Sequence, residues 1–331
     1  MPVPLSARLD RLQQRRPALG LPIAVVYKYA DDQGPYLAAL ITYYGFISLF
    51  PLLLLLSTVT GFVLAGDASA RDAVVGSALH QFPIARQQLD ENPAGIGGGP
   101  TGLVIGLLGA LYGGLGIGQA VQNAMNTVWQ VPRNNRPNPL LARLRGLALL
   151  ATAGVAVALT AVLSSLAAGA GALTEGHGTW WQLVVRAGFV AGSVVVNTGV
   201  FVLAFRHATT RSLTIRQVIP GAVCAAVVYQ LLQSFGATYV SHVVRSASAV
   251  NSLFAVVLGL LAFLYLASAA TVLCAEINVV RVDRLWPRAL LTPFTDDVDL
   301  TPGDEKTYTG TAKAARSKGF EQVDVTFDKQ D

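Results

Sequence analysis

The stretch Leu40–Leu64, LITYYGFISLFPLLLLLSTVTGFVL, carries no charged residue and decides the fold class. A helix needs roughly 20 apolar residues to cross a hydrocarbon layer of about 30 Å, and this run of 25 is long enough. The predicted span that contains it begins at residue 37, after some 36 residues that include basic groups, so we expect it to stay in the mature protein rather than to be removed as a signal peptide. It predicts a membrane-spanning helix.

The composition of the whole chain agrees with this stretch. Hydrophobic residues make up 53% of the 331 residues and charged residues 13%, and the mean hydropathy is +0.50. These values lie outside the range of soluble domains. We therefore predict an all-α, polytopic integral membrane protein with about six transmembrane helices. The predicted spans are 37–65, 101–129, 147–170, 184–205, 217–240 and 252–276.

Lysine and arginine are distributed unevenly between the two sides of this six-span arrangement. The N-terminal arm, the loops after the second and fourth spans and the start of the C-terminal tail together carry fifteen. The opposite side carries four, namely Arg71, Arg86, Arg186 and Arg245. Because basic residues remain preferentially in the cytoplasm, both termini are predicted to be cytoplasmic. The basic inner surface also predicts contact with anionic lipid head groups rather than with nucleic acid, for which no recognition module is present.

The predicted organisation has three parts. Residues 1–36 form a cytoplasmic, amphipathic N-terminal arm, and residues 37–280 form the transmembrane domain, which includes an extracytoplasmic loop at 66–100. Residues 281–331 form a cytoplasmic tail. The tail is polar and nearly free of aliphatic residues beyond Leu291, so it is predicted to be largely disordered.

A proline interrupts the first span. Pro51 removes one helical hydrogen bond and frees the carbonyl of Ile47, which must find another partner in lipid, for instance Ser48. One interpretation is that Pro51 only bends a helix that is longer than the membrane is thick. The other is that the bend opens a polar cavity, toward which Thr42, Tyr43, Tyr44 and Ser48 turn.

The second span combines small residues with amides. Four amides share one helical face because they are spaced at offsets of 0, 3, 4 and 7 residues. They are predicted either to make hydrogen bonds between helices or to line a polar cavity. The amides are Gln119, Gln122, Asn123 and Asn126. Glycine pairs four residues apart precede or overlap this face and allow close helix packing, either within the chain or in an oligomer. The pairs are Gly102/Gly106, Gly109/Gly113 and Gly114/Gly118.

Glu276 is the acidic residue that falls inside a predicted span, at its cytoplasmic end. An ionisable side chain in a membrane segment is a candidate functional group. We expect its partner among the arginines of the inner surface or on the amide face, and a structural pairing with Arg281 is the alternative. Asn278, two residues further on, is a second candidate at the same helix end.

Catalytic and metal-binding patterns are absent from the sequence. The four histidines are scattered, and neither a phosphate-binding glycine loop nor a nucleophile elbow occurs. Cys224 and Cys274 lie in predicted spans and are interpreted as small apolar residues. No catalytic residue, metal site or soluble cofactor is therefore predicted, and the chain is not expected to be an enzyme.

Four stretches resemble the YihY/BrkB family of bacterial inner-membrane proteins. They are AALITYYGFISLFPLLLLL in the first span, NAMNTVWQVPRN at the end of the second, PGAVCAAVVYQ in the fifth and CAEIN at the end of the sixth. Cys274 stands where the family usually has glycine. The resemblance implies a helical, multi-pass protein of the cytoplasmic membrane. Members have been linked to serum resistance and envelope phenotypes and proposed as transporters, and an older assignment of ribonuclease activity is regarded as mistaken.

These features together favour a bacterial inner-membrane transporter, or a protein that handles a lipid or another envelope component through a cavity open to the cytoplasm. The substrate would be a small anion or a lipid. The alternative is a membrane scaffold or envelope-assembly factor that transports nothing. Candidate cavity residues are Glu276, Asn278, Gln119, Gln122, Asn123, Asn126, Tyr43, Tyr44 and Ser48, with Pro51 as the bend.

Overall fold

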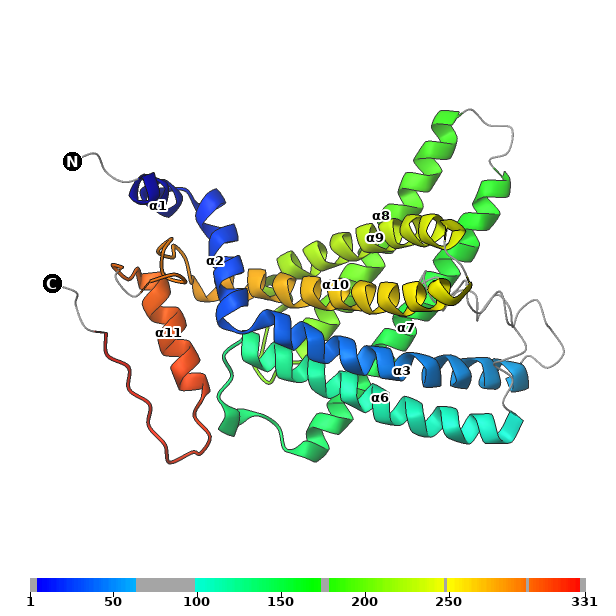
Figure 1. Cartoon of the computed structure of the whole chain (residues 1–331), viewed down its shortest axis with the longest axis horizontal. Coiled ribbons are helices and arrows are strands. Elements are labelled where there is room, and N and C mark those ends of the chain that lie inside the picture. Colours follow the sequence, from blue (N-terminus) through cyan, green and yellow to red (C-terminus); the bar gives the residue numbers. More distant parts are fainter. Residues whose placement is uncertain (1–4, 64–98, 174–178, 247–248, 296–297, 328–331) are drawn as a thin grey trace.

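The computed structural model describes residues 5–63, 99–173, 179–246, 249–295 and 298–327, and these ranges are helical with no strand among them. Figure 1 shows a bundle of long helices with α1, α2 and α11 gathered at one end, here called the α2 end. One short 3-10 turn, Arg133–Asn135, follows the second long helix. The helices are α1 (Leu5–Arg15), α2 (Pro17–Asp31), α3 (Gly34–Val63), α6 (Gly99–Val128), α7 (Pro139–Leu173), α8 (Thr179–His207), α9 (Ile215–Ser246), α10 (Ala249–Asp283) and α11 (Pro302–Ala314).

Each of the six predicted spans falls on one long helix, in the predicted order, from α3 to α10. The helices continue past the predicted bounds at their polar ends, because hydropathy detects the apolar run and not the last helical turn. Four helices of the described chain are long and apolar enough to cross a membrane. They are Val104–Val128, Trp180–His207, Ile215–Gly236 and Val257–Asp283. The all-α membrane fold is thus confirmed, while the count of six spans stays a prediction.

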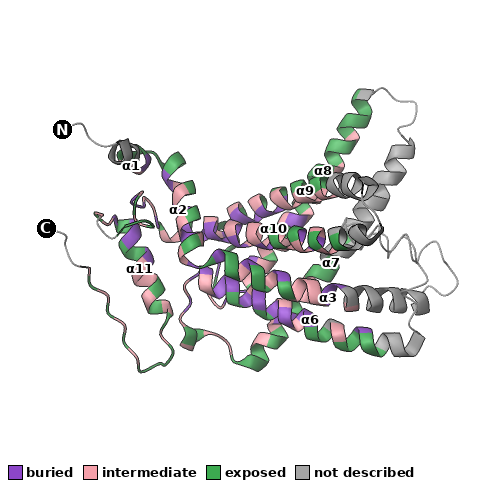
Figure 2. Ribbon diagram, viewed as in Figure 1, coloured by how far each residue is buried: buried purple, intermediate pink, exposed green. Residues whose placement is uncertain are grey.

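Large apolar side chains are exposed along the long helices. Leu108 and Tyr112 on α6, Trp180 on α8 and Phe235 on α9 are each more than half exposed. Figure 2 shows exposed residues along the outer parts of α6 and α8, away from the α2 end. Apolar side chains in such numbers are stable on a surface that faces lipid rather than water.

The packed core lies at the α2 end and combines buried residues of α2, α6, α8, α9 and α10. Small residues such as Ala24 on α2, Ala124 on α6 and Ala275 on α10 are buried there, so the helix backbones approach closely. The larger side chains of Met125 and Phe205 fill the remaining space.

Glycines on α6 are used within this chain. A Cβ atom at Gly113 would lie 2.5 Å from the Cβ of Ser48 on α3, and one at Gly118 would lie 2.6 Å from the Cα of Gly146 on α7. Gly109 similarly faces the ring of Pro51. The glycines therefore permit α6 to pack tightly between α3 and α7.

The N-terminal residues differ from the predicted surface arm. α2 is part of the packed core, because its residues Ala24 and Val25 are buried among the core side chains and because α10 packs against this helix. The boundary predicted at residue 36 therefore does not separate a peripheral arm from the bundle. The predicted outer loop 66–100 lies outside the described residues, except for the two residues at the start of α6.

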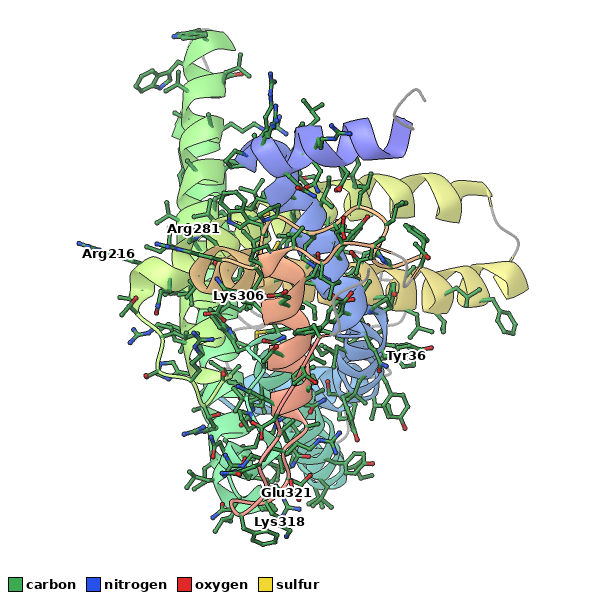
Figure 3. The ribbon with its side chains drawn as sticks, turned by 90° about the vertical axis from the view of Figure 1, so that its left-hand side faces the viewer. Tyr36, Arg216, Arg281, Lys306, Lys318 and Glu321 are labelled. Atoms are coloured by element: carbon green, nitrogen blue, oxygen red, sulfur yellow. The ribbon has the colours of Figure 1, made fainter. Side chains whose placement is uncertain are left out.

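The C-terminal tail also differs from the prediction of disorder. Residues 302–314 form α11, which begins with a capping box between Thr301 and Asp304. Fully buried Arg288 donates from Nε to Asp304 and from Nη2 to Asp31 of α2, 3.0 Å away. Figure 3 shows α11 lying across the α2 end of the bundle. The tail is ordered by buried ion pairs and hydrogen bonds rather than by the aliphatic burial that composition measures.

The charge of Arg288 is favoured at this contact. Burial alone disfavours a charged guanidinium, but the hydrogen bond to Asp304 and the charges of Asp31 and Asp304 outweigh it and raise the pKa of Arg288. Two further bonds join the same elements: Gln13 donates to the carbonyl of Arg288, 2.5 Å away, and Tyr27 donates to that of Leu290, 2.6 Å away. α1, α2 and α11 are thus held as one unit.

We expect Gly118→Leu to destabilise the protein, because its side chain would meet the α7 backbone, which cannot move aside as a flexible side chain does. Overpacking of this kind costs about 1–3 kcal/mol or more. Thermal unfolding in detergent measures the effect. The matched control is Gly199→Leu on α8, where an added Cβ meets open space. Equal melting temperatures for the two variants would contradict the close α6–α7 contact.

We expect Asp304→Asn to release α11, because it removes a charged hydrogen-bond partner of Arg288 at a buried site. Loss of a hydrogen bond to a charged group costs about 2 kcal/mol, which corresponds to a roughly 30-fold faster amide exchange in α11. Glu305→Gln removes the same charge from the exposed neighbouring position and should leave exchange unchanged. Hydrogen–deuterium exchange compares the two, and unchanged protection in Asp304→Asn would refute the role of this pair.

Candidate functional site

Three charged side chains meet inside the α2 end: Lys28, Asp32 and Glu276, here called the charge cluster. Their side chains are 0%, 3% and 0% exposed. Lys28 lies in the last turn of α2, Asp32 is the residue that ends this helix, and Glu276 lies on α10. Charged groups are almost never fully buried unless they are paired, so this arrangement requires a physical account.

A tight turn between α2 and α3 positions the first two residues. The backbone amide of Asp32 donates to the carbonyl of Lys28, 2.9 Å away, and Gln33 then adopts a left-handed conformation with φ of 56°. Gly34 follows, where any side chain would collide with the ring of Tyr29. Because Lys28 and Asp32 are four residues apart, their side chains lie on one face and form an ion pair.

Lys28 contacts three acceptors from three parts of the chain. Its Nζ donates to Oδ2 of Asp32 and to the carbonyl oxygen of Val128, 3.3 Å away, and it lies 3.8 Å from Oε2 of Glu276. Val128 is the last residue of α6, where the helix dipole places partial negative charge. The ammonium group therefore holds the ends of α2 and α6 against α10.

The carboxyl groups are less well satisfied. Neither carboxylate oxygen of Glu276 accepts a hydrogen bond from any part of the chain that the structure describes. Burial raises the pKa of Asp32, although the charge of Lys28 and its hydrogen bond oppose this effect. The cluster holds two carboxyl groups and one ammonium group at a buried position, so its negative charge is only partly balanced.

A second polar contact lies further along α10, where this helix packs against α3. Thr42 on α3 donates to Ser268 on α10, 3.3 Å away, and both side chains are buried. Ser268 lies eight residues before Glu276, which is about two turns along the same face of α10. α10 therefore makes two polar contacts along its length, one with the charge cluster through Glu276 and one with α3 through Ser268.

The four predicted amides of α6 do not act as one surface. Buried Gln122 donates to the carbonyl of Ala142 on α7, 2.9 Å away, and buried Asn126 accepts from the backbone amide of Thr210, 3.0 Å away. Asn123 is exposed and accepts from Arg136, 2.8 Å away, and Gln119 is exposed. Gln122 and Asn126 thus make contacts of the interhelical kind, and neither is joined to the charge cluster.

The candidates on α3 also lie apart from the cluster. Tyr43 is exposed, and its ring packs edge-on against that of Tyr44, with centroids 5.2 Å apart. Ser48 is buried beside α6 and donates to the carbonyl of Gly45, 3.0 Å away, rather than to that of Ile47. The helix continues through Pro51 to Val63.

Asn278 joins α10 to α9. Its Oδ1 accepts from the backbone amide of Gly221, 2.8 Å away, close to Pro220, whose ring removes one backbone donor from the same helix. Its Nδ2 has no acceptor among the described residues. Gly221 is required here, since any Cβ would collide with the carbonyl of Cys274 and the amide of Asn278.

The partner expected for Glu276 was wrong. Arg281 is exposed at the margin of the α2 end (Figure 3). The base that lies beside Glu276 is Lys28, which the sequence alone places only among the basic residues of the N-terminal arm. One signal could have found it: Lys28 is a lone charge in the apolar run that ends at Asp31 and Asp32, and Asp32 lies four residues further on.

The described residues contain no group of three or more histidine, cysteine, aspartate or glutamate side chains placed to hold a metal ion. Arg211, in the turn between α8 and α9, instead forms a bidentate pair with Asp283 at 2.7 and 2.8 Å and stacks on Trp129. This pair ties the turn to the end of α10. It is partly exposed and separate from the charge cluster.

Long apolar helices with exposed apolar surfaces, joined at one end around buried charges, define a helical integral membrane protein with several spans. Residues 25–291 match the family model described as virulence factor BrkB, and the chain belongs to this family. Inner membrane protein YhjD of Escherichia coli (strain K12) is 24% identical over 278 residues, which cover 79% of this chain and 81% of YhjD. No solved structure matches the chain.

We expect Lys28→Met to destabilise the protein strongly, because two buried carboxyl groups then lose their base. Removing one partner of a buried ion pair costs about 3–5 kcal/mol. Adding Asp32→Asn should recover part of this loss, since one uncompensated carboxyl group is removed. Thermal unfolding in detergent measures all three proteins. Arg281→Met, which removes an exposed base, is the control, and an equally large loss in this control would refute the importance of the cluster.

Proposed function

We propose that this chain is a multi-pass protein of the bacterial cytoplasmic membrane that transports or handles an anionic lipid or another anionic envelope component. The α2 end would face the cytoplasm. The proposed route runs along the contact between α3 and α10, from the charge cluster to Thr42 and Ser268. The predicted polar cavity remains a proposal and would open along this contact.

The observation that carries the proposal is the burial of Glu276 next to Lys28 and Asp32. Charged side chains inside a membrane bundle are costly, and a packed apolar core would hold the same helices together at least as well. Glu276 in particular accepts no hydrogen bond from the described residues, and its contact with Lys28 is a longer one of 3.8 Å. A functional role accounts for retaining these charges.

The arginines at the α2 end support the choice of an anionic molecule and the orientation. Arg133, Arg143, Arg216, Arg281 and Arg284 are exposed at helix ends or in turns on this side, and Figure 3 shows Arg216 and Arg281 extending from its margin. Such a surface attracts anionic head groups at the cytoplasmic face. The name of the relative YhjD, an inner membrane protein, supports the same location.

A second candidate is a scaffold or envelope-assembly factor that moves nothing. The contacts of Gln122 with α7 and of Asn126 with the turn after α8 favour it, because these polar groups serve helix packing. The docked α11 provides a further surface on the same side. This candidate leaves Glu276 with no role beyond its 3.8 Å contact with Lys28.

Mass spectrometry distinguishes the two candidate functions. It identifies the lipids and small molecules that copurify with the protein in native-membrane discs. We expect at least one anionic species to be enriched over the bulk membrane with wild type and to be reduced several-fold with Glu276→Gln. The control is Asp283→Asn, which removes a carboxylate seven residues later on α10 and should keep the enrichment. Bulk-like profiles for all three folded proteins would contradict transport or lipid handling and favour the scaffold.

A further inference from the structure

The charge cluster contains one base for two acids. Lys28 pairs directly with Asp32, while its Nζ is 3.8 Å from Oε2 of Glu276, which is beyond hydrogen-bond distance. Both oxygens of Glu276 are buried and receive no hydrogen bond from the described chain. With every group ionised, one negative charge would remain uncompensated among side chains that are 0–3% exposed.

We propose that the charge cluster is a proton-binding site, in which the carboxyl groups of Asp32 and Glu276 share one proton beside the ammonium group of Lys28. One bound proton makes the three side chains neutral as a group. It also supplies the hydrogen-bond donor that the carboxyl oxygens of Glu276 lack. The site does not depend on the proposed function, because it holds whichever molecule the protein handles and whether or not it transports at all.

A proton fits this site better than a metal ion. Calcium takes six to eight oxygen ligands and magnesium six, whereas the cluster offers two carboxyl groups and the carbonyl of Val128, which already accepts from Lys28. The ammonium group also stands where a second cation would be repelled. A shared proton requires only two carboxyl groups close enough to interact, and the side chains of Asp32 and Glu276 are hydrogen-bond partners when one of them carries a proton. In such a pair, like charges disfavour ionisation of both groups.

The surrounding charges do not remove the imbalance. On α2, Asp31 is paired with Arg288, which lies after α10 and also pairs with Asp304, so Arg288 has no spare positive charge for the cluster. Tyr29 on α2 and Tyr265 on α10 also face the cluster, and burial raises the pKa of Tyr29, with smaller contributions from Tyr265 and Glu276, which keeps this phenol neutral. From α6 the cluster meets the uncharged carbonyl of Val128. The raised pKa of Asp32 agrees with a carboxyl group that retains a proton in this environment.

The proton links two separate elements. Asp32 belongs to the turn between α2 and α3, and Glu276 belongs to α10, so a shared proton forms a bond between them. Its loss would place two carboxylates next to each other beside a single ammonium group. While the proton is bound, the folded protein carries one more proton than the unfolded chain, whose carboxyl groups are ionised above their ordinary pKa. Stability must therefore fall as the pH rises through the titration of the site.

Infrared difference spectroscopy tests the site in the full-length protein in lipid discs, titrated from acidic to alkaline pH. We expect wild type to show a carboxylic acid C=O band near neutral pH that shifts in D₂O and disappears at alkaline pH. Both Glu276→Gln and Asp32→Asn should lose it, since either removes half of the shared pair. Asp283→Asn should retain it, because Asp283 is paired with Arg211 and partly exposed.

Thermal unfolding over the same pH range provides a second measurement, which does not require every variant to be equally stable. For wild type, one linked proton changes the ratio of folded to unfolded protein about tenfold per pH unit, with stability falling toward alkaline pH. Glu276→Gln should flatten this dependence. The proposal is overturned if wild type shows no protonated carboxyl band, if the band survives in both Glu276→Gln and Asp32→Asn, or if sodium ions remove the band at constant pH.

Discussion

The ammonium group of Lys28 is the contact on which the packed end of this protein depends. It is buried where α2, α6 and α10 converge. It pairs with Asp32 of the α2–α3 turn, donates to the carbonyl of Val128 at the end of α6 and lies 3.8 Å from the carboxyl group of Glu276 on α10. An unpaired ammonium in this position would be prohibitively costly, so the helices must end where acceptors are available. The ends of α2 and α6 thus lie where this one charge finds its acceptors.

The two acids at the end of α2 divide their roles. Asp31 pairs with Arg288 and through it with α11, whereas Asp32 pairs with Lys28 inside the bundle. These neighbouring residues point to different partners, so the end of α2 joins the membrane helices to the docked C-terminal helix. A change in the charge state of Asp32 therefore occurs next to the contact that holds α11, which gives the proposed proton site a physical connection to the surface of the protein.

The fold was largely predictable, and the site only in part. A long apolar run predicts a membrane helix, so the sequence predicts the long helices from α3 to α10 in their order. Glu276 is a candidate because it is an acid in such a run. Lys28 was missed because it lies 248 residues from Glu276, and local patterns do not report pairs at that separation. Spacing predicts one amide face on α6, but Gln122 and Asn126 are buried while Gln119 and Asn123 are exposed. The partners on α7 and in the turn after α8 could not be read from spacing. α11 was missed because composition measures apolar burial, whereas Arg288 and Asp304 order it through polar contacts.

The pairing of Lys28 with a residue four positions away also bears on biosynthesis. Glu276 and Arg288 are made long after α2 leaves the ribosome, so α2 cannot reach its final packing until α10 and the segment beyond it have been synthesised. During that interval Asp32 is already available to Lys28 within a single helical turn. The local pair shields the lysine until its distant partners arrive, and the insertion of the intervening helices can proceed without a bare charge at the end of α2.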